Sequence, residues 1–158
     1  KLMEEKGVFL SIDLEEGTSQ VGEMKEIIGE CPDLKIAIGH FGMVTYPDWQ
    51  EQIKLARNKN VMIESEGGTC LFNDEFYPFK GAVWAIREAA SLVGMDKLMW
   101  GSDYPHAEGT FPISRRIVDD LFEGLNVSDE CRLGVLGLNA ARLFRIDPVV
   151  QTSEKLAA

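Results

Sequence analysis

Acidic and imidazole side chains stand near the ends of short apolar runs in this sequence. Asp103 follows the run 98–100 after two small residues, Gly101 and Ser102, and Pro105 prevents the run from continuing as a strand. His40 ends a second run, and Asp13 lies near the end of a third. In α/β barrels, the catalytic groups lie at the carboxyl ends of buried parallel strands. A histidine and an aspartate at one such rim can bind a metal together, or act as polariser and base.

Four further polar residues lie near the same run ends. Ser11 shares its run with Asp13, Glu64 and Glu66 flank the end of the run 61–65, and His106 follows Pro105. A substrate at the rim could meet any of these side chains. One of the two glutamates could face the interior of a barrel.

Each candidate also has an ordinary structural explanation. Asp103 and Asp13 could cap a turn or the following helix. His40 could be held by a backbone hydrogen bond at a strand end, and His106 could be a plain loop residue. Of the two glutamates, one could be solvated while the other closes a hydrogen bond. These alternatives stay open at the level of single residues.

The spacing of apolar residues predicts four repeats of strand, loop and helix. Continuous apolar runs predict strands over 8–14, 34–39, 61–65 and 98–101. Residues at helical spacing predict helices over 19–31, 47–58, 81–93, 113–124, 129–136 and 139–144. Trp49 and Trp84 fall on the apolar stripes of two of these helices, which predicts that both pack in the core.

Strands that alternate with helices at this period predict an α/β fold with a parallel sheet. Four units are half of a (β/α)8 barrel, which needs about 250 residues. A free half barrel would expose sheet edges, so we expect either a missing amino-terminal half or a homodimer. The chain begins with Lys1 and no initiator Met, which fits a chain entered midway. We expect residues 1–147 to form the half barrel and residues 148–158 to be a solvated tail.

Net charge, apolar runs and cysteines limit the kinds of partner and compartment that this chain can have. A net charge of −10 disfavours nucleic acid and anionic membrane surfaces as partners. It says little about a small-molecule substrate, because the local charge of a pocket can oppose the net charge. No apolar run reaches the ~18 residues that a membrane span needs, and the first ten residues do not resemble a signal peptide. The three cysteines, Cys31, Cys70 and Cys131, form no close pair and fit free thiols in a reducing compartment, so we expect a cytoplasmic protein.

Three segments resemble the amidohydrolase-related family, the group that includes aminocarboxymuconate-semialdehyde decarboxylase, related aromatic-acid decarboxylases and pyrone-dicarboxylate lactonases. They are residues 33–42 (DLKIAIGHFG), 98–106 (LMWGSDYPH) and 137–144 (GLNAARLF). They occur in that family's order and nearly at its spacing, and the resemblance covers about residues 7 to 146.

The resemblance implies a distorted (β/α)8 barrel of which this chain would be strands five to eight. His40 matches the family's strand-six histidine, a metal ligand or substrate contact. Asp103 matches the strand-eight aspartate, which binds metal and shuttles a proton. The family's strand-one His-x-His pair would lie upstream, and the strand-five position, often histidine, is Ser11 here. The implied cofactor is a divalent metal, either zinc or, as an alternative, manganese. Because Ser11 stands where the family often has a histidine ligand, a metal-free member of the family is the other alternative.

The implied function is metal-dependent hydrolysis of a small carboxylate, lactone or amide. A metal-bound water would attack, Asp103 would move its proton to the leaving group, and His40 would hold the metal or a substrate oxygen. Ser11, Asp13, Glu64 and His106 are the candidate substrate contacts. Two alternatives remain: a non-oxidative decarboxylase of the same family, and a catalytically inactive half barrel with a structural or binding role.

Overall fold

A single parallel sheet forms the centre of the fold. The computed structural model describes residues 1–65, 75, 79–101 and 119–147. The strands are β1 (Phe9–Ile12), β2 (Lys35–Ile38), β3 (Val61–Glu64) and β4 (Leu98–Met99), paired in parallel in the order β1-β2-β3-β4. The predicted strands and their parallel α/β arrangement are therefore confirmed.

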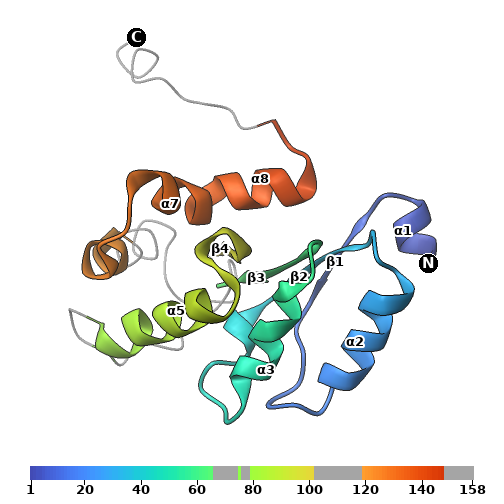
Figure 1. Cartoon of the computed structure of the whole chain (residues 1–158), viewed down its shortest axis with the longest axis horizontal. Coiled ribbons are helices and arrows are strands. Elements are labelled where there is room, and N and C mark those ends of the chain that lie inside the picture. Colours follow the sequence, from blue (N-terminus) through green and yellow to red (C-terminus); the bar gives the residue numbers. More distant parts are fainter. Residues whose placement is uncertain (66–74, 76–78, 102–118, 148–158) are drawn as a thin grey trace.

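One face of the sheet is covered by the helices that connect the strands. These are α2 (Val21–Glu30), α3 (Trp49–Ile53) with a 3-10 turn over Lys54–Arg57, and α5 (Lys80–Val93) (Figure 1). Alternate strand residues, such as Ile36, Ile38 and Ile63, point toward these helices and are at most 1% exposed. Burial of these branched side chains, at roughly 1.5–3 kcal/mol each, holds the connecting helices against the sheet.

The opposite face is covered at its amino-terminal end by α8 (Asn139–Phe144). Ala37, Met62 and Met99 point to this face and contact Leu143 in a separate small cluster. The ring of Phe144 lies 4.5 Å, centroid to centroid, from that of Phe9 at the start of β1. The helix therefore crosses the region where the strands begin, and it does not extend over the carboxyl edge of the sheet.

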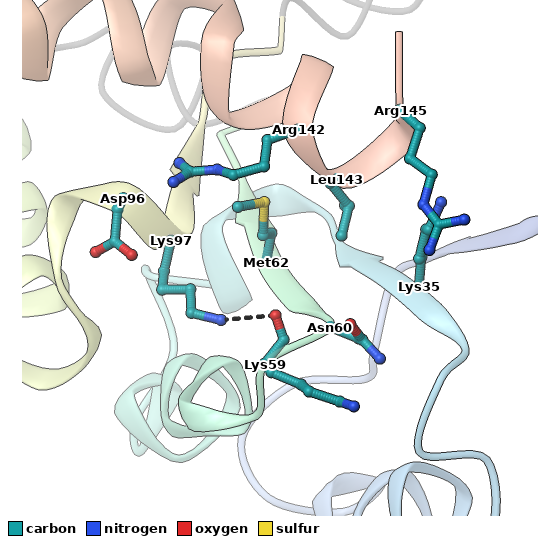
Figure 2. A pocket seen from close by; sticks show the side chains of 9 residues that line it. All are labelled: Lys35, Lys59, Asn60, Met62, Asp96, Lys97, Arg142, Leu143 and Arg145. Carbon is teal, nitrogen blue, oxygen red and sulfur yellow. Dashed lines mark hydrogen bonds between the residues drawn. The ribbon is translucent and has the colours of Figure 1, made fainter.

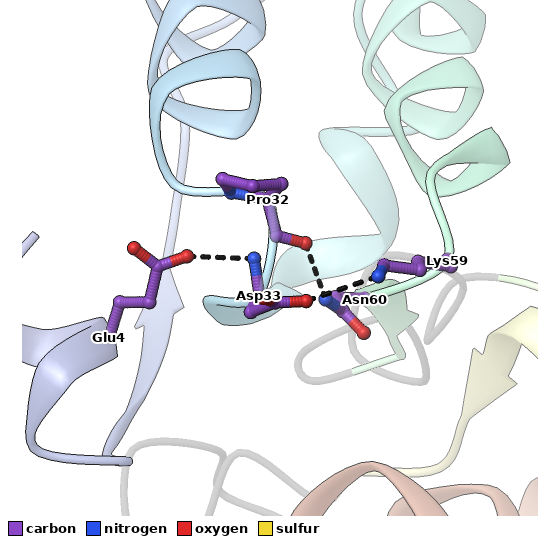
Figure 3. A network of polar contacts seen from close by, with 5 residues as sticks. All are labelled: Glu4, Pro32, Asp33, Lys59 and Asn60. Carbon is purple, nitrogen blue, oxygen red and sulfur yellow. Dashed lines mark hydrogen bonds and ion pairs between the residues drawn. The ribbon is translucent and has the colours of Figure 1, made fainter.

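Side-chain amides and charges fix the beginnings of the strands. Asn139 is 3% exposed, and its Nδ2 donates to the carbonyls of Met95 (3.1 Å) and Leu98 (2.8 Å), just before and in β4. A second network, shown in Figure 3, links the turn before β2 to neighbouring elements. Glu4 of α1 (Leu2–Glu5) accepts from the backbone N–H of Asp33 at 2.7 Å. The carboxylate of Asp33 in turn pairs with Lys59 at 3.1 Å.

Several details differ from the predictions. Trp84 is 55% exposed and touches Trp49 only edge-on, so its predicted place in the core is wrong. The buried face of α5 consists of Ala82, Ala85 and Ala89, whose small side chains let the helix lie close to the sheet. The helix expected over 47–58 splits into α3 and a 3-10 turn, and α1 was not expected.

The carboxyl-terminal helices are confirmed where the structure describes them. Residues 119–125 of the helix expected over 113–124 are helical. The segment expected over 129–136 is α7 (Asp129–Leu133) followed by a π-helical turn, Gly134–Leu138, and Ser128 caps it by accepting from the Cys131 N–H at 3.2 Å. Within the described ranges, no helix is both long and apolar enough to cross a membrane.

Candidate functional site

Asp13 and His40 meet at the carboxyl edge of the sheet. Asp13 follows β1 and His40 follows β2, and because these strands are adjacent and parallel their ends come together. His40 Nδ1 lies 2.7 Å from Asp13 Oδ1, but the ring N–H is not aligned on that oxygen as in a linear hydrogen bond. The side chains are 30% and 53% exposed, so a small molecule can approach both.

The backbone at His40 is held in an unusual conformation. His40, Phe41, Gly42 and Met43 all have positive φ, between 50° and 63°. Left-handed backbone costs roughly 1–2 kcal/mol for each residue with a side chain, and such strain is concentrated at functional sites. Burial of Phe41, whose ring stacks on that of Trp49 at 6.0 Å, opposes this cost. The turn carries the imidazole back toward Asp13 instead of continuing β2.

Gln52 of α3 holds the loop that follows Asp13, and the sequence pattern did not mark it as a functional residue. It is fully buried, and its Nε2 donates to the carbonyls of Glu15 (2.7 Å) and Gly17 (3.1 Å) in the loop that follows Asp13. A Cβ on Gly42 would lie 3.2 Å from Gln52 Cβ, so the same helix also supports the left-handed turn. The available signal was a polar residue on an apolar helical stripe, three residues after Trp49.

Glu64 lies at the end of β3 beside Gly101, just past β4. A side chain on Gly101 would bring its Cβ to 2.5 Å from Glu64 Oε1, so the carboxylate lies where it does because residue 101 has no side chain. The Gly101 N–H donates to Ser65 Oγ at 3.1 Å, which fixes the two strand ends relative to each other.

Of the remaining candidate residues, only Ser11 lies in the described part of the chain. Ser11 is exposed on β1, opposite Ala37, and strand alternation places it on the same face as Glu64. Asp103, His106 and Glu66 lie outside the described residues. Among the residues that are described, no three His, Cys, Asp or Glu side chains form a group that could hold a metal ion.

The described part of the site supplies one imidazole with a carboxylate behind it. A carboxylate at Nδ1 favours the tautomer protonated there and directs Nε2 toward a ligand, an arrangement typical of metal-binding histidines. His40 and Asp13 therefore fit one position of a metal site and its supporting group. A catalytic zinc needs about three protein ligands, so this pair is part of a ligand set and not the whole.

Solved structures with the same fold come from the amidohydrolases and their relatives. An amidohydrolase from Burkholderia multivorans with bound zinc matches with a TM-score of 0.70 and 15% identity, covering 92% of this chain and 55% of that one. A protein described as a 2-pyrone-4,6-dicarboxylic acid hydrolase, from Pseudomonas putida, matches with a TM-score of 0.64 and 24% identity, with the same two coverages. A dihydroxybenzoic acid decarboxylase from Polaromonas with bound manganese matches with a TM-score of 0.57 and 14% identity, covering 93% and 52%.

The chain spans about half the length of these solved structures. No protein of curated function matches its sequence significantly. The sequence model described as Amidohydrolase matches residues 1–146, which is nearly the whole chain. The three segments noted in the sequence all lie inside this match. The chain therefore belongs to the Amidohydrolase family.

Proposed function

We propose that this chain forms the carboxyl-terminal half of the active site of a metal-dependent hydrolase. The observation that carries the proposal is the His40–Asp13 pair at the carboxyl edge of a parallel sheet, in a chain of the Amidohydrolase family. The substrate class would be a small carboxylate, lactone or amide. Reaction at this edge agrees with the general rule for α/β barrels.

In this proposal the four strands are strands five to eight of a (β/α)8 barrel. Two features support the assignment: the strands are parallel in sequence order, and the solved structures of this fold are nearly twice as long. The position of α8 also fits, because a helix across the beginnings of the strands would close the bottom of a barrel and leave its catalytic mouth open.

A divalent metal is part of the proposal, since related structures hold zinc or manganese. His40 would hold it through Nε2, and Asp103, four residues after β4 in the sequence, would supply a carboxylate. The other ligands would come from strands that precede this chain in a longer protein. Such a metal would lower the pKa of a bound water toward ~7, and it would polarise the scissile carbonyl.

The chain's own residues would then divide the work. Asp13, whose Oδ1 lies 2.7 Å from Nδ1, would favour one orientation of the His40 ring through its charge. Asp103 accepts a proton from the attacking water and returns it to the leaving group. Ser11 and Glu64, which share one face of the sheet, would contact the polar groups of the substrate together with His106.

Decarboxylation is the second candidate reaction, because dihydroxybenzoate decarboxylases share this fold. In that case Asp103 would deliver a proton to the carbon that loses carbon dioxide. An inactive half barrel with a binding role is the third possibility, and it predicts neither turnover nor specific metal binding.

The test uses the full protein that contains this chain, loaded with zinc or manganese. Turnover is measured on a pyrone dicarboxylate lactone and on 2,6-dihydroxybenzoate, and the metal content is measured by elemental analysis. His40→Asn and Asp103→Asn should abolish turnover while the circular dichroism spectrum is kept. Asp13→Asn should reduce turnover or metal affinity about 10- to 100-fold. Asp33→Asn, at the opposite edge of the sheet, serves as the matched control. Unchanged turnover in Asp103→Asn would reject its assigned role.

A further inference from the structure

A pocket of about 260 Å³ lies at the amino-terminal edge of the sheet, beneath α8. Lys35 is the first residue of β2, Asn60 immediately precedes β3, and Lys97 immediately precedes β4. Arg142 and Arg145, in and just after α8, cover the pocket from above (Figure 2). It is therefore on the opposite edge of the sheet from His40 and Asp13. In α/β barrels that edge serves stability and not catalysis.

The lining of this pocket is strongly cationic, in a chain whose net charge is −10. Five of the 16 basic residues line it, and the only carboxylate among the lining residues is Asp96. Like charges gathered in a small volume repel one another, and this repulsion lowers the stability of the folded chain unless an anion offsets it. Lys59 pairs with Asp33 at 3.1 Å, whereas within the described ranges the other four cations form no ion pair with a carboxylate, so most of this positive charge is not neutralised locally.

Lys97 is a cation fixed in place. Its Nζ donates to the carbonyls of Asn58 (2.8 Å), Lys59 (3.1 Å) and Val61 (3.3 Å), which uses all three N–H groups of the ammonium. Burial lowers the pKa of Lys97, the nearby carboxylate of Asp96 opposes this decrease, and the charge of Arg142 adds to it. The ammonium is thus partly desolvated and oriented by three carbonyls, so its charge acts on whatever occupies the pocket.

The two guanidinium groups reach different ends of the pocket. Arg142 extends toward the side of Asp96 and Lys97, and Arg145 toward the side of Lys35 (Figure 2). Arg142 is oriented by donating to Asn139 Oδ1 at 2.5 Å. Across the described ranges, neither arginine forms an ion pair with a carboxylate. The two arginines lie near the carboxyl end of α8, where positive charge interacts favourably with the helix dipole. The dipole does not explain why lysines from the strands lie in the same pocket.

We infer that this pocket is a binding site for a small, multiply charged oxyanion, held by the guanidinium groups in and just after α8 and by Lys35 at the beginning of β2. Lys97 contributes its positive charge, since its three N–H groups already donate to backbone carbonyls. Phosphate and polycarboxylates share the required chemistry, because both present several oxygens that accept charge-assisted hydrogen bonds from arginine and lysine. The site does not depend on the proposed hydrolase function, and it lies away from the residues that would carry it.

The test measures binding of inorganic phosphate and, separately, citrate to the full chain by isothermal titration calorimetry and by thermal unfolding. Sodium chloride at matched ionic strength is the reference, because nonspecific screening by chloride equals that by phosphate or citrate at the same ionic strength. We expect saturable binding of at least one anion and a dose-dependent rise in Tm beyond that of chloride. Tighter binding of phosphate than of citrate would indicate a site for phosphates, and the reverse would indicate a site for polycarboxylates.

A double variant, Lys35→Gln with Arg145→Gln, should weaken binding about tenfold or more. The matched control is Lys6→Gln with Lys25→Gln, which removes the same charge from exposed positions elsewhere and should change affinity less than about twofold. Equal loss in both variants, or no saturable binding beyond chloride in the unmodified chain, would overturn the inference. If neither anion binds and the double variant instead changes the sedimentation coefficient, the pocket is a contact for another protein chain.

Discussion

Asn139 offers the most direct test of how α8 is fixed to the sheet. Both donors of its amide are used, since Nδ2 donates to the Met95 and Leu98 carbonyls, and Oδ1 accepts from Arg142. Asn139→Ala removes these contacts and leaves the Leu98 carbonyl buried without its partner. An unsatisfied buried carbonyl costs about 1–3 kcal/mol, and each further lost hydrogen bond about 1 kcal/mol.

We therefore expect Asn139→Ala to lower the free energy of unfolding by about 2–4 kcal/mol. For a chain of this size each 1 kcal/mol corresponds to about 2–4 °C in Tm, so a loss near 3 kcal/mol lowers Tm by about 6–12 °C. The measurement is urea unfolding followed by circular dichroism, with the m-value compared between variants.

The control is Asn58→Ala, the same substitution at an exposed position. Its amide makes one local hydrogen bond, to the Leu55 carbonyl at 2.8 Å, and we expect a loss of about 0.5–1 kcal/mol. If Asn139→Ala destabilises the chain no more than Asn58→Ala, the attachment of α8 through this amide would be refuted.

Three further predictions concern the helices and the site. Gly42→Ala should destabilise the folded chain by about 1–3 kcal/mol, because φ is +63° and the added Cβ would lie 3.1 Å from a core methyl group. Gly29→Ala, in α2 with open space around it, should instead stabilise the folded chain by about 0.5–1 kcal/mol. Chemical unfolding measures both changes. Gln52→Leu should loosen the loop after β1 and increase amide hydrogen exchange there, with protection unchanged in α2. The pKa of the Cys131 thiol is raised, chiefly by burial, so its alkylation should reach half its maximal rate at a higher pH than that of a small free thiol; an equal or lower midpoint by mass spectrometry would contradict this.

Much of the fold could be predicted because its signals are local. Continuous apolar runs identified the strands, and helical spacing identified α2, α5 and α8. The placement of Asp13 and His40 at one edge also followed, since parallel strands end on the same side. The error at Trp84 has a simple cause. Helical spacing admits more than one apolar stripe on α5, and the close approach to the sheet selected the alanines.

Local patterns in the sequence were enough to predict the four strands, most of the helices, and the polar residues that follow the strands. The contacts that those residues make became visible only in the folded chain. The contact between Asp13 and His40 depends on a left-handed turn that α3 supports, and the cationic pocket unites Lys35, Lys97 and Arg145 from distant parts of the chain. Neither could be predicted from periodicity, because side-chain contacts across elements depend on backbone dihedrals and helix positions that packing of the whole chain selects.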